Sequence, residues 1–103
     1  MFIARWQIDA RFGHKATTVD LMRKWEREIG PQVGLPEMEF LLLSGSIGAR
    51  EATIEANHKV ESLAQLEQFF EKIGGLEAHH AWGRELEPSV VSGSSRWQIF
   101  RVL

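Results

Sequence analysis

The chain has 103 residues, of which 44% are hydrophobic and 25% are charged, and its formal net charge is -2. This composition excludes a disordered or fibrous chain and predicts one globular domain spanning residues 1–103. The small negative charge offers no basic surface for nucleic acid, and the lack of cysteine excludes disulfides and thiolate metal sites.

Apolar segments are short throughout the chain. The longest late run, Phe40 to Leu43, is too short to cross a bilayer, and Phe2 to Ala4 before Arg5 is too short for a signal peptide. We therefore expect a cytoplasmic protein with no membrane partner.

The first half of the chain contains a strand, a helix and the start of a hairpin. Residues 2–9 alternate between apolar and polar side chains, which predicts a half-covered strand. Thr17 or Thr18 is expected to cap a helix that ends near Gly30 or Gly34. Its buried stripe is predicted to contain Met22, Trp25 and Ile29. Residues 37–44 then form a second strand, and residues 45–48 supply turn material.

The second half repeats this pattern. Residues 52–60 alternate as a third strand, and Ser62 with Gln65 forms a capping box that opens a helix ending at Gly74-Gly75. Its buried stripe is predicted to contain Leu63, Leu66, Phe70 and Ile73, with Phe69 beside it. A shorter helix over 76–86 precedes a loop at 92–95 and a final strand.

The resulting β-α-β-β-α-β order predicts an α+β, ferredoxin-like fold, in which helices cover one face of a four-stranded antiparallel sheet. The tetrapeptide Arg-Trp-Gln-Ile occurs in the first strand at 5–8 and in the last at 96–99. These two strands can be antiparallel neighbours, although the topology does not require it, and Trp6 and Trp97 would then share the helix-covered face.

The element order, the segment Val60-Glu61-Ser62-Leu63-Ala64-Gln65-Leu66 and the His-bearing region after it resemble the dimeric α+β barrel superfamily. This group includes antibiotic-biosynthesis monooxygenase-like and NIPSNAP-like proteins. The resemblance covers nearly the whole chain. It implies an obligate homodimer that pairs through the open sheet face, and a small molecule bound in the cleft between sheet and helices or inside the barrel.

The richest chemical cluster lies at residues 76–85. It contains His79, His80, Trp82 and Arg84, and imidazole can transfer protons near neutral pH. The two histidines point about 100° apart on a helix, so they are poorly placed to bind one metal ion, and no metal site is expected. The alternative interpretation is structural, with one histidine packing or capping near the helix end and the other in solvent.

His58 is the third candidate catalytic residue. It falls on the apolar side of the third strand, where it either packs as a neutral imidazole with one hydrogen-bond partner or acts as a general base in a cleft under the second helix. The opposite side carries Arg5, Gln7 and Asn57, which are candidates for ligand binding. Pairing of mixed charges between subunits is the alternative for this polar face.

Some relatives in the resembled superfamily bind haem through a histidine late in the second helix, where His79 and His80 fall. The haem-degrading members add a tryptophan and a first-strand asparagine, whereas this chain has Phe69 or Phe70 and Gln7. Haem oxygenation is therefore disfavoured, and we expect no cofactor. The resulting hypothesis is a cofactor-free monooxygenase or isomerase that binds a small organic molecule, and the alternative is a non-catalytic dimerisation or regulatory module.

Overall fold

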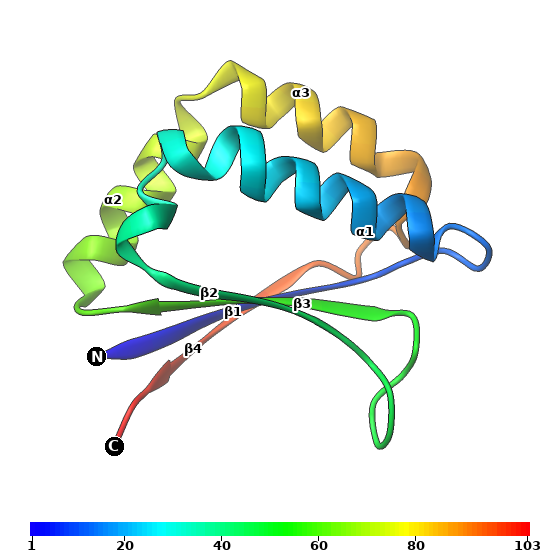
Figure 1. Ribbon diagram of the computed structural model, residues 1–103, viewed down its shortest axis with the longest axis horizontal. Coiled ribbons are helices and arrows are strands. Elements are labelled where there is room, and N and C mark those ends of the chain that lie inside the picture. The colour runs from blue at the N-terminus through cyan, green and yellow to red at the C-terminus, as the bar shows by residue number, and fades with distance from the viewer.

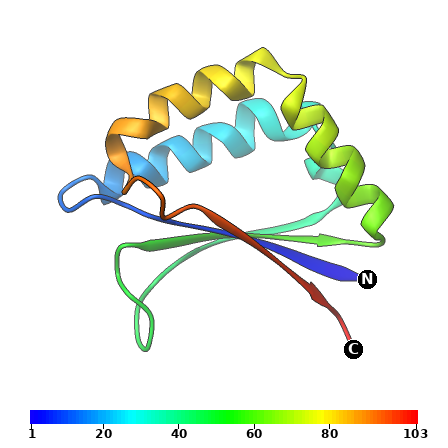
Figure 2. The same ribbon diagram turned by 180° about the vertical axis from the view of Figure 1, so that it is seen from behind.

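The computed structural model describes all 103 residues and contains one antiparallel sheet with every helix stacked on the same face (Figure 1). The strands are β1 (Phe2–Asp9), β2 (Glu39–Ser44), β3 (Thr53–Val60) and β4 (Arg96–Arg101). The helices are α1 (Lys15–Lys24), α2 (Leu63–Gly74) and α3 (Glu77–Leu86), and the reverse view shows the other sheet face bare (Figure 2). The predicted ferredoxin-like α+β class is confirmed, with the second crossover divided into two helices. None of these helices has the length and apolar character that crossing a bilayer requires.

The strand order is β2-β3-β1-β4, so the first strand lies at the centre between the third and the last. β1 and β4 are antiparallel, and Trp6 lies directly opposite Trp97. The predicted pairing of the two Arg-Trp-Gln-Ile copies is therefore confirmed. Cross-strand pairing of the two indoles places them together on the helix-covered face.

Strict alternation divides the residues of the sheet between its two faces. Along β3, Ile54, Ala56, His58 and Val60 are all buried, and the residues between them are half-buried. The covered face continues into a core that includes Met22, Trp25 and Ile29, which confirms the stripe predicted for the first helix.

The start of α1 differs from the prediction. The helix begins at Lys15, and neither Thr17 nor Thr18 caps it, because both lie inside the first turn. Thr18 is fully buried, and its hydroxyl lies 2.9 Å from the carbonyl oxygen of His14 and 3.1 Å from that of Ser89. The threonine therefore ties α1 to the segment before β4 instead of capping the start of the helix.

After α1 the chain continues as a π-helical turn, η1 (Trp25–Ile29), before two 3-10 turns lead to β2. The indole N–H of Trp82 on α3 donates to the carbonyl oxygen of Leu21 at 2.7 Å, just before this turn. The same carbonyl also accepts the backbone N–H of Trp25. A side chain bonded to a helix carbonyl is a recognised cause of such local irregularity, and π turns are frequent at functional sites.

The cap of α2 matches the prediction, but its buried stripe is rotated. Ser62 Oγ accepts the backbone N–H of Gln65 at 3.1 Å, as expected for an N-cap. Leu66 and Phe69 are buried, whereas Leu63 is 54% exposed and Phe70 is 39% exposed. The stripe that faces the sheet therefore passes through Phe69 at i+3 from Leu66, and the prediction for Leu63 and Phe70 was wrong.

Candidate functional site

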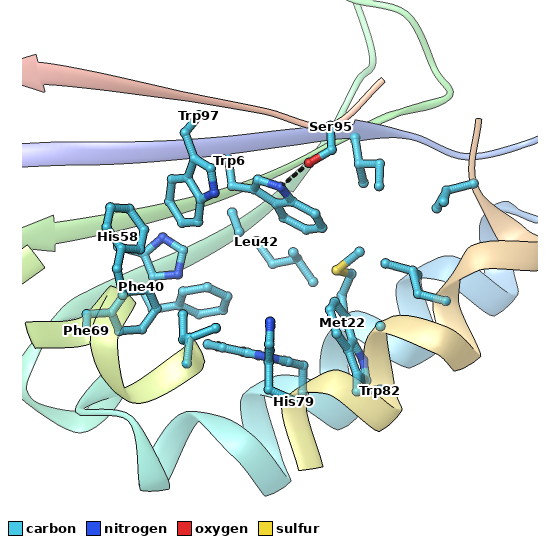
Figure 3. A pocket seen from close by; sticks show the side chains of 18 of the residues that line it. Trp6, Met22, Phe40, Leu42, His58, Phe69, His79, Trp82, Ser95 and Trp97 are labelled. Atoms are coloured by element: carbon cyan, nitrogen blue, oxygen red, sulfur yellow. Dashed lines mark hydrogen bonds between the residues drawn. The ribbon is translucent and has the colours of Figure 1, made fainter. Parts of the chain in front are cut away.

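A cavity of about 380 Å³ lies between the helices and the covered face of the sheet (Figure 3). Strands supply Trp6, His58 and Trp97, and helices supply His79 and Trp82. Most of the lining is hydrophobic, with Trp, Phe, Ile, Leu, Met and Val side chains. The remaining lining residues are Ile8, Met22, Trp25, Phe40, Leu42, Ala56, Phe69, Phe70, Ile73, Gly83, Leu86, Glu87, Val90 and Ser95.

Trp25, the first residue of the π-helical turn, lies at the centre of the aromatic lining. Its ring centroid is 6.2 Å from that of Phe69 and 6.3 Å from that of Trp82. The two imidazoles flank it, with His58 at 6.5 Å and His79 at 6.3 Å, both edge-on to the indole. Aromatic side chains at these separations pack favourably and hold one another in place. Trp25 therefore fixes the positions of both cavity histidines.

His58 is only 3% exposed, and its Nδ1 lies 3.3 Å from the carbonyl oxygen of Ala4 on the neighbouring strand. A carbonyl oxygen can only accept, so Nδ1 carries the proton and Nε2 keeps a lone pair. Burial lowers the pKa of His58 below 6.5, although its backbone contacts to Ala4 and Ala56 act in the opposite direction. The lowered pKa favours a neutral imidazole at pH 7, and its Nε2 forms no hydrogen bond within the protein.

His79 has the opposite arrangement. The indole Nε1–H of Trp25 donates to its Nδ1 at 2.9 Å, and an indole N–H cannot accept. In neutral His79 the proton is therefore on Nε2. Burial, and secondarily the neighbouring His80, lowers the pKa of His79 below 6.5. The ring stacks on Trp82 at a centroid distance of 5.7 Å, and Figure 3 shows it pointing from α3 toward the sheet.

Two partly exposed aromatic residues, one on α2 and one on β4, lie at the edge of the cavity. Phe70 and Trp97 are each 39% exposed, and their rings meet edge-to-face at 5.0 Å. Nearby, the indole N–H of Trp6 donates to Ser95 Oγ at 2.8 Å, which ties the loop before β4 to the cavity wall (Figure 3). Aromatic side chains and a short polar loop therefore form the rim.

Two residues of the predicted cluster lie outside the cavity. His80 is exposed, and its Nε2 lies 2.9 Å from the carbonyl oxygen of Gly74, the last residue of α2. It thus caps the end of α2, in agreement with the structural alternative for one histidine of the pair. Arg84 is exposed and pairs with Glu77 at 3.0 Å on the solvent side of α3. Only His79 and Trp82 of this cluster line the cavity.

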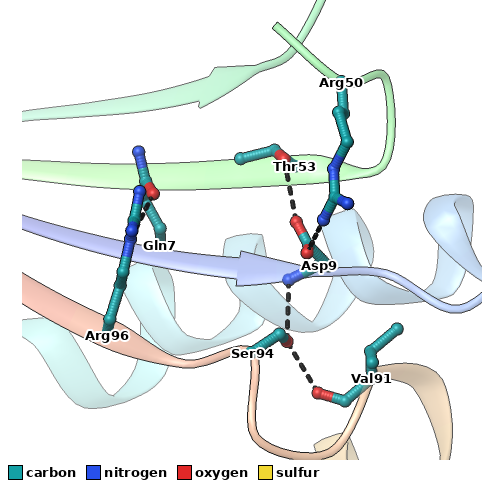
Figure 4. Close-up of polar contacts among 7 residues, drawn as sticks. All are labelled: Gln7, Asp9, Arg50, Thr53, Val91, Ser94 and Arg96. Atoms are coloured by element: carbon teal, nitrogen blue, oxygen red, sulfur yellow. Dashed lines mark hydrogen bonds and ion pairs between the residues drawn. The ribbon is translucent and has the colours of Figure 1, made fainter.

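Arg5, Gln7 and Asn57 lie on the open face of the sheet, where they form hydrogen bonds with other polar residues of that face instead of lining the cavity. Arg5 Nε lies 3.2 Å from Asn57 Oδ1 and 3.1 Å from a carboxylate oxygen of Glu55. Arg96 donates to Gln7 Oε1 at 2.9 Å (Figure 4). The polar groups of this face are therefore already partnered within one chain.

A second polar group on this face joins three segments around Asp9 (Figure 4). The Asp9 carboxylate accepts a hydrogen bond from Thr53 Oγ1 at 2.8 Å and pairs with Arg50 from the β2–β3 hairpin. The Asp9 backbone N–H donates to Ser94 Oγ at 3.1 Å, and Ser94 donates to the carbonyl oxygen of Val91 at 2.6 Å. These contacts hold the loop that carries Ser95 at the cavity rim.

The sequence treated Trp6, Trp25 and Trp97 as core residues, and the structure places all three in the cavity wall. One signal that could have revealed the site is the spacing of His79, Trp82 and Leu86 at i, i+3 and i+7, which puts them on one helix face.

No group of three or more His, Asp or Glu side chains is arranged to hold a metal ion.

No protein-family model matches this chain, and no curated protein matches it. Among solved structures, it is similar to an uncharacterized NIPSNAP domain protein from Burkholderia xenovorans, with a TM-score of 0.81 and 7% identity over 100% of this chain and 95% of that chain. It is also similar to a NIPSNAP family protein from Agrobacterium tumefaciens, with a TM-score of 0.79 and 16% identity over 99% of this chain and 92% of that chain. A third similar structure is an antibiotic biosynthesis monooxygenase, with a TM-score of 0.71 and 10% identity over 100% of this chain and 99% of that chain. At these identities the likeness establishes the shared fold.

Proposed function

We propose that this chain binds a small organic molecule in the aromatic cavity and acts on it by proton transfer. The observation that supports this most directly is an apolar cavity of about 380 Å³ faced by two neutral imidazoles. His58 has a free lone pair on Nε2 and can accept a proton from the ligand. His79 has a proton on Nε2 and can donate a hydrogen bond to the oxygen on which negative charge develops.

This division of roles suits reactions that begin by removing a proton from an acidic O–H or C–H group. Both reaction classes expected from the sequence, isomerisation and cofactor-free oxygenation, start with that step. The shared fold with an antibiotic biosynthesis monooxygenase is compatible with the second class. Desolvation in the cavity strengthens the hydrogen bond from His79, because the effective dielectric constant there is lower than in water.

Adjacent histidines provide a matched test of the binding site. A panel of small aromatic compounds is screened by quenching of tryptophan fluorescence, since Trp6, Trp25, Trp82 and Trp97 all line the cavity. We expect a ligand that binds the wild-type chain to bind His79→Ala at least ten-fold more weakly. His80→Ala removes a neighbouring imidazole that lies outside the cavity and should leave the affinity within about two-fold. A panel without any ligand, or equal losses in both variants, would contradict the proposal.

We further propose that the open sheet face pairs with a second copy of the chain. Leu41, Leu43 and Phe100 project from this face and are 62%, 42% and 45% exposed. Because Arg5 is already paired with Glu55, these apolar side chains are the part of the surface that gains most from being covered. A twofold pair of identical faces would bury them against each other.

Analytical ultracentrifugation tests this pairing separately from ligand binding. We expect wild-type protein at micromolar concentration to sediment at twice the 11.8 kDa chain mass. Leu41→Glu should shift the population to monomer, whereas Leu63→Glu, on an exposed site of α2, should not. A monomeric wild-type protein contradicts the pairing and leaves the cavity proposal standing.

The exposed apolar side chains of this face also favour a second candidate function, a non-catalytic dimerisation or regulatory module. In that case the protein dimerises through Leu41, Leu43 and Phe100, and no compound of the panel quenches its tryptophan fluorescence. The two functions therefore predict the same sedimentation and different binding.

A further inference from the structure

We infer that the ligand of the cavity is an aromatic molecule without anionic groups, with a hydroxyl group directed at His58 and a carbonyl oxygen directed at His79. This inference rests on the proposed function and adds the chemical class of the ligand. It follows from the opposite hydrogen-bonding character of the two imidazoles and from the absence of cationic side chains in the lining.

His58 can only accept a hydrogen bond from a ligand. Its Nδ1 proton is directed at the carbonyl oxygen of Ala4. Nε2 forms no hydrogen bond within the protein, and His58 lines the cavity, so this lone pair is the group that the imidazole offers to a ligand. The rings of Phe69 and Phe40, each 5.1 Å away, and of Trp97, at 5.5 Å, keep the imidazole from turning. A hydroxyl group is the ligand group that satisfies this lone pair.

His79 can only donate. Its Nδ1 lone pair is occupied by the indole N–H of Trp25, and its stacking on Trp82 fixes the ring plane. The free Nε2–H has no protein acceptor and belongs to a cavity-lining residue that Figure 3 shows projecting toward the sheet. A carbonyl oxygen is the simplest partner for a single N–H donor in an apolar wall.

The charge of the wall excludes anionic ligands. No lysine or arginine lines the cavity, so a carboxylate or phosphate would be buried there without a counter-charge. Glu87 is the single carboxylate of the lining, and it is exposed to solvent. Four indoles leave aromatic stacking as the main source of affinity.

Four probes separate these contributions in wild-type protein. They are naphthalene, β-naphthol, methyl β-naphthyl ketone, and a naphthalene that carries both the hydroxyl and the acetyl group at opposite ends. Affinities are measured by isothermal titration calorimetry at pH 7. Each correctly matched hydrogen bond should strengthen binding by roughly five-fold over naphthalene, and the compound with both groups should bind most tightly.

Variants assign each group to its histidine. His58→Asn keeps an amide N–H near Ala4 and lacks Nε2, so it should lose the advantage of the hydroxyl group and keep that of the ketone. His79→Phe should lose the advantage of the ketone alone, and His79→Gln, which restores an N–H near the position of Nε2, should recover part of it. The contrast between the two ligand groups within each variant corrects for general damage to the cavity.

Three results would overturn the assignment. If none of the four probes binds although another compound of the panel does, the inferred ligand class is wrong, and if nothing in the panel binds, the proposed function itself fails. If all four bind with equal affinity, the cavity is an aromatic site and the inference about the two polar groups is wrong. If the hydroxyl advantage disappears in His79→Phe and persists in His58→Asn, the two roles are reversed. Because the wild-type series needs no variant to fold, the first two outcomes are decisive on their own.

Discussion

Gly83 gives the most direct test that the cavity is a site and not a packing defect. It lies inside α3 and lines the cavity, and a Cβ added there would meet no heavy atom within 4 Å. Glycine inside a helix is less stable than alanine by about 0.8–1 kcal/mol. Since the added methyl group meets no clash, we expect Gly83→Ala to raise the free energy of unfolding by most of that amount.

A larger side chain at Gly83 should separate stability from binding. Gly83→Leu also favours the helix and extends an isobutyl group into the cavity, so we expect unchanged or higher stability together with at least ten-fold weaker binding of any aromatic ligand. Chemical denaturation followed by circular dichroism measures the first quantity, and calorimetry with the naphthalene probes measures the second. A destabilised Gly83→Ala variant would refute the reasoning, because it would mean that the space beside α3 is occupied.

Three further predictions follow from the histidines and the helix cap. Because the pKa values of His58 and His79 are lowered from 6.5 in the folded protein, the unfolded state binds more protons below pH 6.5, and stability is complete above that pH and falls on acidification. Denaturation at pH 7.5 and 5.5 should detect this loss, of which His58 contributes at most about 1.4 kcal/mol per pH unit, and equal stability at both pH values contradicts it. Trp25→Phe removes the donor to Nδ1 of His79 and should raise the pKa of that imidazole in an NMR titration, whereas Trp6→Phe should leave it unchanged; the reverse pattern would reject the tautomer assignment. Ser62→Ala should lower the free energy of unfolding by about 1 kcal/mol through loss of the α2 cap, and a change below 0.3 kcal/mol would show that the cap is dispensable.

The sheet could be predicted from the sequence because its signal is local. In β3 every second residue is buried, and this period of two is already visible in the order Ile54, Ala56, His58, Val60. Helix rotation was harder, because Leu63, Leu66, Phe69, Phe70 and Ile73 admit two overlapping stripes. Packing against the sheet selects the stripe through Phe69. This is a tertiary contact, so the sequence of the helix alone does not reveal it.

Only part of the candidate site could be predicted from the sequence, because helix rotation and long-range contacts decide which side chains line the cavity. The sequence identified His58, His79 and Trp82, but it grouped them with His80 and Arg84, which the rotation of α3 turns to solvent. Thr18 was wrongly assigned as a helix cap because a threonine before an apolar stripe suits that role locally, whereas its hydroxyl bonds Ser89 from a distant segment. The hydrogen bond between Trp25 and His79 joins residues 54 positions apart and has no sequence signature.

The size of the cavity itself argues that it is occupied or accessible in the working protein. A sealed, empty cavity destabilises a protein by about 24 cal/mol per Å³, so that 380 Å³ would correspond to about 9 kcal/mol. That is comparable to the entire stability of a domain of this length. The protein does not have to bear this cost if the cavity is open to solvent. The partly exposed Phe70 and Trp97 at its edge would let water or ligand fill the space. Replacing cavity water with an aromatic ring that also satisfies His58 and His79 would then stabilise the fold, and a matched ligand should raise the unfolding temperature as its concentration increases.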